Sequence, residues 1–280
     1  MTGDGALDLR RMLPPGSMKR FSMALVAISI GLMGAGCRDD GVGMQSAITA
    51  GERPSRLLYV AVGASETFGM GATDPSREAW PEVFFRMALP RRAKFLNLGI
   101  PGATVADAIA QEARYAASLK PEIVTVWLNV NDILSGVDVD AYERDLDKLL
   151  RLLTTDEETT VLVANTPPLE WLPSFRACLP NPRKGGPECD LKFAPSRPSA
   201  VDRLIESYNK AIARAAARAG AWVVDLHSAT LALALRGRVE DLVARDGFHP
   251  STKGHKEVAK AFAEVFAANV RQAWPNATSG

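Results

Sequence analysis

The sequence predicts an α/β fold built on a mainly parallel five-stranded sheet. Five short apolar runs have the length and composition of buried strands, and stretches with apolar residues at helical spacing lie between them. Strands that alternate with helices in this way form a parallel sheet that is covered on both faces. The chain has 280 residues, of which 47% are hydrophobic, so it can bury one large core in a single domain.

The expected elements follow from the apolar pattern, taken in chain order. The expected strands are residues 57–62, 94–98, 123–128, 160–164 and 221–224. The expected helices are residues 78–89, a helix that begins at Thr104, and residues 142–153, 204–215 and 256–274. Asp107, three residues after Thr104, completes an approximate capping box. Glu112 falls near the apolar face of that helix and narrows it.

The segment from Thr166 to Ser199 interrupts this alternation. It is crowded with proline, shows little periodicity and is far longer than an ordinary connection between a strand and a helix. Because it leaves the carboxyl end of a predicted strand, we expect it to form a wall or lid there, with Trp171, Leu172 and Phe175 lining a pocket. The alternative is that these three side chains form a small apolar cluster beneath a long loop.

The charge and histidine content exclude several classes of function. The formal net charge is +1, so no broad field favours nucleic acid or acidic partners. Of the three histidines, His227 and His255 have no other metal-ligating residues at useful spacing. We expect His227 to lie in a loop and His255 on the surface of a helix. The sequence therefore predicts neither a metal site nor a cofactor.

The amino-terminal 37 residues have the organisation of an export signal. Met18-Lys19-Arg20 precedes an apolar run over residues 21–32, and Gly34-Ala35-Gly36 precedes Cys37. This arrangement resembles a bacterial lipoprotein signal, in which the cysteine is lipidated and becomes the first residue, although an ordinary secretory signal is the alternative. We expect an exported protein of the bacterial cell envelope, on the periplasmic side or the cell surface, held to the membrane by lipid on Cys37.

The domain boundaries follow from the same changes in composition. The signal covers residues 1–37, with Met18 as a candidate start of translation, and a polar, flexible tether covers residues 38–56. The folded domain is expected over residues 57–274, with residues 166–199 as an inserted loop and residues 275–280 as a tail.

Two cysteines remain for pairing if Cys37 carries lipid. Cys178 and Cys189 lie in the proline-rich segment, with ten residues between them. In an exported chain an even pair favours a disulfide, and the alternative is two unrelated thiols.

Polar residues follow several of the predicted strands. Ser65 follows the first strand, Gly102 the second and Asn131 the third. Because the carboxyl ends of parallel strands share one edge of the sheet, these residues are expected to converge there. Ser65 is the candidate nucleophile. The backbone N–H groups of Ser65 and Gly102 and the side-chain amide of Asn131 are candidate donors for an oxyanion.

The candidate base lies between the last strand and the last helix. The loop reads Asp246-Gly247-Phe248-His249-Pro250, and imidazole titrates close to neutral pH. Asp246 lies three residues before His249 on a tight turn, where its carboxylate can accept from Nδ1 while Nε2 faces the serine. An isolated instance of this pattern is more often a plain turn with a surface histidine, so its weight comes from the combination with Ser65 and the other loops.

These residues resemble the SGNH or GDSL hydrolases. Ser65, Gly102, Asn131, and Asp246 with His249 match the four blocks of that family in order, and the similarity extends from Leu57 to about Trp274. The resemblance implies a flavodoxin-like three-layer α/β/α sandwich and ester hydrolysis through an acyl-enzyme, without a metal.

Two positions depart from the family pattern. The family's Gly-Asp-Ser is Gly63-Ala64-Ser65 here, and the usual glycine two residues before Asn131 is Asn129. Neither departure touches a candidate catalytic residue, but both affect how the loops are braced.

Two interpretations of function remain. The first is a serine esterase that acts on a carboxylic ester of a lipid, an acetylated sugar or a small molecule. The second is a non-catalytic envelope lipoprotein that uses the fold as a binding module, an alternative motivated by Ala64 and Asn129. Phosphate binding by Gly63, Gly69 and Gly71 is disfavoured because no Lys-Ser or Lys-Thr follows these glycines. An ordinary α/β-hydrolase is disfavoured because Thr67 stands where its nucleophile turn needs glycine.

Overall fold

The computed structural model describes the region that carries the predicted strands and the candidate site. The chain divides into two units, residues 1–50 and 51–280, and the described residues all belong to the second. They are residues 57–156, 158–179, 189, 198–236 and 240–269. The expected signal with Cys37, the tether over residues 38–56 and the tail over residues 275–280 lie outside the described residues and stay predictions.

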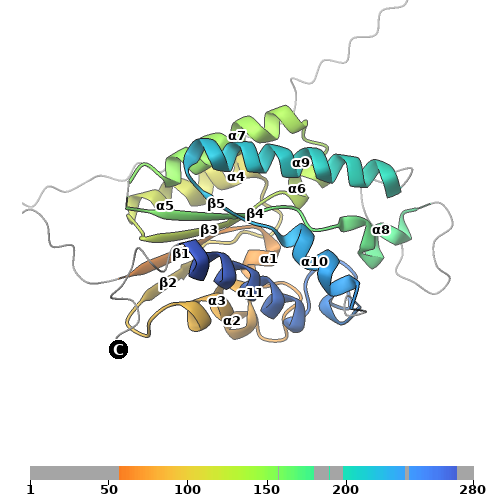
Figure 1. Cartoon of the computed structure of the whole chain (residues 1–280), viewed down its shortest axis with the longest axis horizontal. Coiled ribbons are helices and arrows are strands. Elements are labelled where there is room, and N and C mark those ends of the chain that lie inside the picture. Colours follow the sequence, from red (N-terminus) through yellow and green to blue (C-terminus); the bar gives the residue numbers. More distant parts are fainter. Residues whose placement is uncertain (1–56, 157, 180–188, 190–197, 237–239, 270–280) are drawn as a thin grey trace, which may run out of the picture. The chain divides into compact units, whose positions relative to one another are not determined.

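The centre of the fold is a five-stranded sheet with the strand order β2-β1-β3-β4-β5 (Figure 1). All four pairs of neighbouring strands are parallel. The strands are β1 (Leu58–Gly63), β2 (Lys94–Asn97), β3 (Ile123–Trp127), β4 (Thr160–Ala164) and β5 (Trp222–Val224). The predicted α/β fold class and the predicted strand positions are therefore confirmed.

Two layers of helices cover the sheet (Figure 1). One layer contains α4 (Val105–Ala108), α5 (Arg114–Ser118), α7 (Val139–Leu153) and α9 (Pro198–Ala219). The other contains α2 (Pro75–Glu78), α3 (Trp80–Ala88) and α11 (Thr252–Asn269). Alternate side chains of β1 enter the two cores: Val60 and Val62 join the first, whereas Tyr59 and Ala61 join the second.

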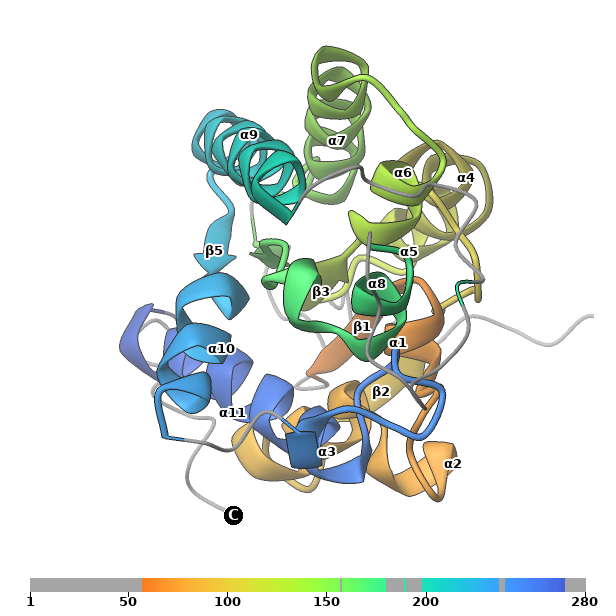
Figure 2. The ribbon, with the colours of Figure 1, turned by 90° about the vertical axis from the view of Figure 1, so that its right-hand side faces the viewer.

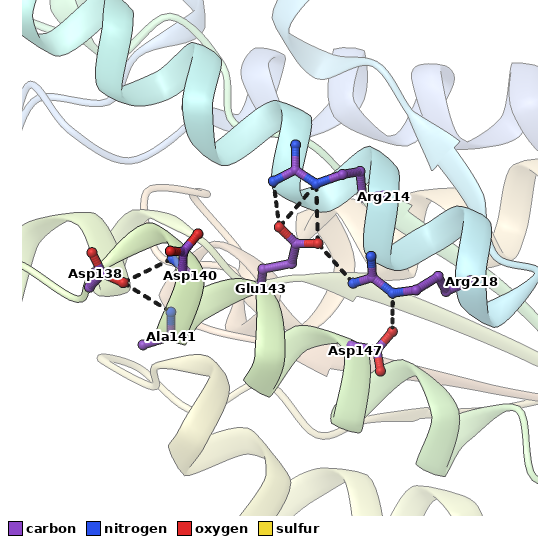
Figure 3. A network of polar contacts seen from close by, with 7 residues as sticks. All are labelled: Asp138, Asp140, Ala141, Glu143, Asp147, Arg214 and Arg218. Carbon is purple, nitrogen blue, oxygen red and sulfur yellow. Dashed lines mark hydrogen bonds and ion pairs between the residues drawn. The ribbon is translucent and has the colours of Figure 1, made fainter.

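Helices α7 and α9 pack along each other through apolar and ionic contacts. Buried Tyr142 and Tyr208 lie with ring centroids 4.4 Å apart. At the surface Glu143 accepts from Arg214 and Arg218, and Arg218 Nε also donates to Asp147 Oδ1 at 2.7 Å (Figure 3). Because these ions face solvent, the buried contacts contribute more to stability than the ion pairs do.

The helix predicted from Thr104 contains an internal irregularity. The expected capping box is present, since Thr104 Oγ1 accepts from Asp107 N and Asp107 Oδ2 accepts from Thr104 N. After α4 the chain forms a π-helical turn, η1 (Ile109–Ala113), before α5 continues. Glu112 in this turn is buried and accepts from Gly63 N at 2.8 Å. A π-turn shifts the side chains that follow it around the helix, and here the turn carries a carboxylate that reaches the end of β1.

The remaining short elements connect these layers near the carboxyl edge of the sheet. They are α1 (Ser65–Phe68), α6 (Val130–Leu134), η2 (Leu169–Trp171), α8 (Pro173–Ala177), α10 (Leu226–Ala234) and η3 (Glu240–Leu242). The sequence pattern did not predict α10, because its apolar residues follow no helical period. None of the helices in the described ranges is both long and apolar enough to cross a membrane.

Two histidines differ from their predicted surroundings. The prediction that His255 lies on a helix surface is wrong, because this residue is fully buried. Its Nδ1 accepts from Trp80 N at 3.2 Å, and its Nε2 donates to Met70 O at 2.9 Å. Two backbone partners distant in sequence make burial of this polar ring possible. The prediction that His227 lies in a loop is also wrong, because this residue is in the first turn of α10.

The buried carboxyl group of Glu112 gives a prediction for stability. Burial raises its pKa from 4.5 to about 8. Because the folded-state pKa is the higher one, the stabilising effect of the protonated form is complete below about pH 4.5 and is lost as the pH rises through 8. The wild-type unfolding free energy should therefore fall as the pH rises from 4.5 to 8.5. In Glu112→Gln, which cannot ionise, we expect this fall to be smaller by a few kcal/mol, measured by urea unfolding across the same pH range.

The control is Glu206→Gln on the surface of α9. The Lys210 ammonium holds the pKa of Glu206 below its usual value, so this group titrates below the window. Its variant should keep the wild-type slope. A Glu112→Gln slope that matches wild type would contradict the prediction.

Candidate active site

Ser65 stands at the end of β1, where the chain turns from strand to helix. It is the first residue of α1 and is 6% exposed. Figure 2 faces this edge of the sheet, with α1, α6, α8 and α10 turned toward the viewer. Gly63 must be small here, because an added Cβ would lie 2.1 Å from Thr67 Oγ1 and 2.9 Å from Trp127 O.

The structure brings Ser65, His249 and Asp246 together in one hydrogen-bonded chain. His249 Nε2 lies 3.0 Å from Ser65 Oγ, and His249 Nδ1 lies 2.7 Å from Asp246 Oδ2. An ionised Asp246 accepts from Nδ1–H, which leaves Nε2 free to accept from the serine hydroxyl. The three residues therefore have the geometry of a nucleophile, a base and a group that orients the base.

The Asp246 carboxylate is held by its own loop. Its Oδ1 accepts from Phe248 N at 2.9 Å and from His249 N at 3.0 Å. Burial raises the pKa of Asp246, but these hydrogen bonds and the adjacent imidazole outweigh burial and lower the pKa below its ordinary value. Asp246 is consequently ionised at neutral pH, the state that fixes the imidazole tautomer.

The candidate oxyanion donors come from the loops after β2 and β3. Gly102 adopts φ +84°, and an added Cβ would meet nothing within 4 Å. The positive φ at this position favours glycine, and no protein atom stands where a side chain would begin. Asn131 Nδ2 donates to Ala103 O at 3.0 Å, a bond that ties the amide to the Gly102 loop. Ile100 N donates to Gly63 O at 2.9 Å and ties the same loop to β1.

Asp132 anchors the start of α4. Its two carboxylate oxygens each lie 3.2 Å from Val105 N. Burial raises the pKa of Asp132 to about 7, although the bond from Val105 N–H opposes the shift. The Asp132 side chain therefore joins the loop after β3 to the first residue of α4.

Sequence reasoning missed Glu66, the residue after the serine. Glu66 is 7% exposed, and its Oε2 lies 3.3 Å from Ser65 Oγ. Burial raises the pKa of Glu66, while its hydrogen bonds and the nearby His249 oppose the shift. The serine hydroxyl thus has acceptors on two sides. The only sequence signal was an acidic residue beside the candidate nucleophile.

The two departures from the family pattern have different surroundings. Ala64 carries no carboxylate, and the acidic groups that reach this turn are Glu112, bound to Gly63 N, and Glu66, beside Ser65. Asn129 is buried, and its Nδ2 lies 3.4 Å from Ala164 O at the end of β4. The Asn129 side chain, which glycine would lack, therefore bridges the ends of β3 and β4.

A cavity of about 110 Å³ opens beside His249 and Glu66. The start of the proline-rich segment forms one wall, which includes the predicted Trp171 and Leu172. Phe175 does not line the cavity: it is buried, and its ring stacks 6.5 Å from Phe248. The prediction for Phe175 was therefore wrong, because α8 turns this ring inward.

The same segment contains the predicted cysteine pair. A disulfide joins Cys178, which directly follows α8, to Cys189, with Cα atoms 4.7 Å apart. Within the described part of the chain, no group of three or more histidine, cysteine or acidic side chains is arranged to hold a metal ion.

Residues 61–257 match the model of the GDSL-like lipase/acylhydrolase family. That span includes Ser65, Gly102, Asn131, Asp246 and His249. A search of curated proteins gave no significant match.

Several solved structures share the fold. A lipase/acylhydrolase from Enterococcus faecalis is 18% identical, with a TM-score of 0.56 over 76% of this chain and 96% of the other. Psychrotrophic esterase EstA from Pseudoalteromonas sp., inhibited by monoethylphosphonate, is 15% identical, with a TM-score of 0.53 over 76% of this chain and 98% of the other. A putative lipolytic G-D-S-L protein from Desulfitobacterium hafniense is 17% identical, with a TM-score of 0.53 over 74% and 98%. At these identities the likeness supports the fold.

The two glycines of the site give a prediction with an internal control. We expect Gly102→Ala to lower the unfolding free energy by about 1 kcal/mol, since only the positive φ is strained. Gly63→Ala should cost about 3 kcal/mol or more, because its Cβ would meet Thr67 and a carbonyl of β3. Urea unfolding of both variants measures the difference, and equal losses would contradict this account of the turn.

Proposed function

The chain belongs to the GDSL-like lipase/acylhydrolase family, and from this premise we propose that it is a serine esterase that hydrolyses carboxylic esters through an acyl-enzyme on Ser65. The observation that carries the proposal is the hydrogen-bonded chain from Ser65 Oγ through His249 to Asp246, at 3.0 and 2.7 Å. A serine hydroxyl is a weak nucleophile without a base in contact, and this arrangement supplies one.

The first half of the reaction forms the acyl-enzyme. His249 Nε2 takes the proton of Ser65 as Oγ attacks the acyl carbon, and the carbonyl oxygen becomes an oxyanion. When the intermediate collapses, the bond to the alcohol oxygen breaks and His249 returns its proton to that oxygen. In the second half a water molecule loses its proton to His249, attacks the acyl carbon and releases the acid, while the proton goes back to Ser65.

Asp246 stabilises the imidazolium that exists between these transfers. Its lowered pKa keeps it ionised, and its hydrogen bond to Nδ1 holds the ring in the productive orientation. The oxyanion would be bound by the backbone N–H groups of Ser65 and Gly102 and by Asn131. One N–H of the Asn131 amide donates to Ala103 O, which leaves the other for the oxyanion.

The direct test is Ser65→Ala. This variant should lose nitrophenyl-ester hydrolysis by a factor of about 10⁴ or more, because no other group supplies the attacking oxygen. A fluorophosphonate reagent, followed by mass spectrometry, should label wild-type Ser65 and leave the variant unlabelled.

The thermal melting point of Ser65→Ala serves as the control for folding. Full activity in a folded Ser65→Ala variant would contradict the proposal. A folded wild-type protein that neither hydrolyses esters nor reacts with the reagent would instead favour the non-catalytic binding module.

The carboxyl group of Glu66 gives a prediction for pH dependence. An ionised Glu66 would place negative charge 3.3 Å from the oxygen that attacks, in a site where negative charge develops. Because burial raises its pKa, Glu66 loses its proton above its ordinary range, and wild-type kcat/KM should fall as it does so. Glu66→Gln stays neutral, so its kcat/KM should extend to higher pH than wild type.

The measurement is kcat/KM for a neutral ester as the pH rises from the ordinary pKa of a glutamate, with Glu206→Gln as a matched control on the surface of α9. The control should follow wild type. Coincident pH profiles for wild type and Glu66→Gln would show that Glu66 does not govern the fall in kcat/KM.

A further inference from the structure

The cavity beside His249 has a defined position along the edge of the sheet. The oxyanion candidates follow β2, β1 and β3, which are neighbours in the strand order. The cavity walls include the segment from Pro167 to Leu172 after β4 and helix α10 after β5. His249 lines this cavity, whereas Gly102 and Asn131 do not. The cavity therefore lies beside the imidazole, and of the strand ends and loops that carry the oxyanion candidates only Glu66, Trp127 and Val130 reach its wall.

Ester hydrolysis assigns different parts of the substrate to the oxyanion donors and to the imidazole. The carbonyl oxygen must face the oxyanion donors, and the departing alcohol oxygen must lie within reach of His249 Nε2, which protonates it. Whatever is attached to the alcohol oxygen therefore extends past the imidazole. In this chain that direction leads toward the cavity.

The lining of the cavity selects for an apolar group. Its polar side chains are those of Glu66, Thr230, His249 and Glu257, and the other side chains that line it are apolar. Helix α10 contributes Ala229 and Leu233, yet Leu226 is its only buried residue. Ala229 and Leu233 are only half-buried, so a bound apolar group would remove more of this face of α10 from water.

The volume limits the size of that group. At about 110 Å³ the cavity is smaller than the cavity of roughly 150 Å³ that accommodates benzene in another protein. It therefore has room for a chain of about four carbon atoms. Trp171 and Leu172 line it on the side of the proline-rich segment.

We propose that this cavity binds the alcohol portion of the substrate, and that the enzyme selects esters of short apolar alcohols with about four carbon atoms. The proposal rests on the proposed esterase function. Acylation then joins the acyl carbon to Ser65 Oγ, breaks its bond to the alcohol oxygen, and returns the serine proton through His249 to that oxygen. The free alcohol leaves from the cavity.

Two series of esters test this assignment. The first keeps acetate and lengthens the alcohol from methyl to octyl, and the second keeps ethanol and lengthens the acid from acetate to octanoate. In the first series kcat/KM should rise about fourfold per methylene up to about butyl and then level or fall, since each buried methylene contributes about 0.8 kcal/mol. All acetates pass through the same acetyl-enzyme, so the alcohol length should act on acylation and not on deacylation.

Variants of α10 locate the effect. Ala229→Phe places a ring in the cavity and should move the optimum to methyl or ethyl, with at least a tenfold loss for butyl acetate and less than a twofold change along the acid series. Ala232→Phe is the matched control, because Ala232 lies on the exposed side of the same helix. It should leave both series unchanged. Leu233→Ala enlarges the cavity and should move the optimum to longer alcohols, which provides a second test if Ala229→Phe does not fold.

The outcomes separate the two proposals. A chain-length optimum that appears in the acid series and moves with Ala229→Phe overturns the assignment, because the cavity would then hold the acyl chain. Alcohol-series profiles that stay the same in folded Ala229→Phe and Leu233→Ala overturn it as well, even if Ser65 is labelled by fluorophosphonate. Absence of both labelling and hydrolysis in wild type overturns the esterase proposal, and the cavity assignment with it.

Discussion

The site depends on how the end of β1 is held in place. The last strand residue, Gly63, donates its N–H to Glu112 and accepts from Ile100 N, while β1 pairs with β2 on one side and β3 on the other. These bonds tie the strand end to both neighbouring strands, to the loop after β2 and to η1. Ser65, two residues later, therefore projects at a fixed point, to which His249 is brought from 184 residues away in the sequence. The hydrogen bonds within each loop thus hold the serine and the imidazole 3.0 Å apart.

Buried carboxyl groups form several of the bonds around the serine, and their burial disfavours their ionised forms. Glu112 holds β1, Asp132 holds the start of α4, and Glu66 lies against the serine. Burial raises the pKa of each, so the protonated forms are favoured where an ionised cluster would oppose an oxyanion. Asp246 differs from these three groups, because its side chain is exposed, its loop supplies two backbone N–H groups and its pKa is lowered. Of the four carboxyl groups, the one stabilised in the ionised form is thus the one that accepts from the imidazole Nδ1.

Most of the fold was predictable because buried parallel strands leave a strong local signal. The five strands are nearly continuous apolar runs, and the capping box at Thr104 needs only residues close in sequence. The candidate triad was predictable because each member ends a strand or lies in a tight turn. The residues that were missed depend on distant partners. His255 is buried through contacts 175 and 185 residues away, and Glu112 reaches Gly63 from a π-turn that no local pattern marks.

Helix α10 was not predicted from the sequence because one of its sides faces the cavity and not the protein core. A helix that packs one face on a core shows a periodic apolar pattern, whereas α10 is apolar around much of its surface and buries only Leu226. Its side chains meet a cavity on one side, so the protein core imposes no period on them. The edge of the sheet is therefore divided: the loops after β2, β1 and β3 supply the serine and the candidate oxyanion donors, whereas the segments after β4 and β5 supply the imidazole with its carboxylate and much of the cavity wall. Because the backbone hydrogen bonds that fix the end of β1 come from the first group, side chains of η2 and α10 can change without altering those bonds.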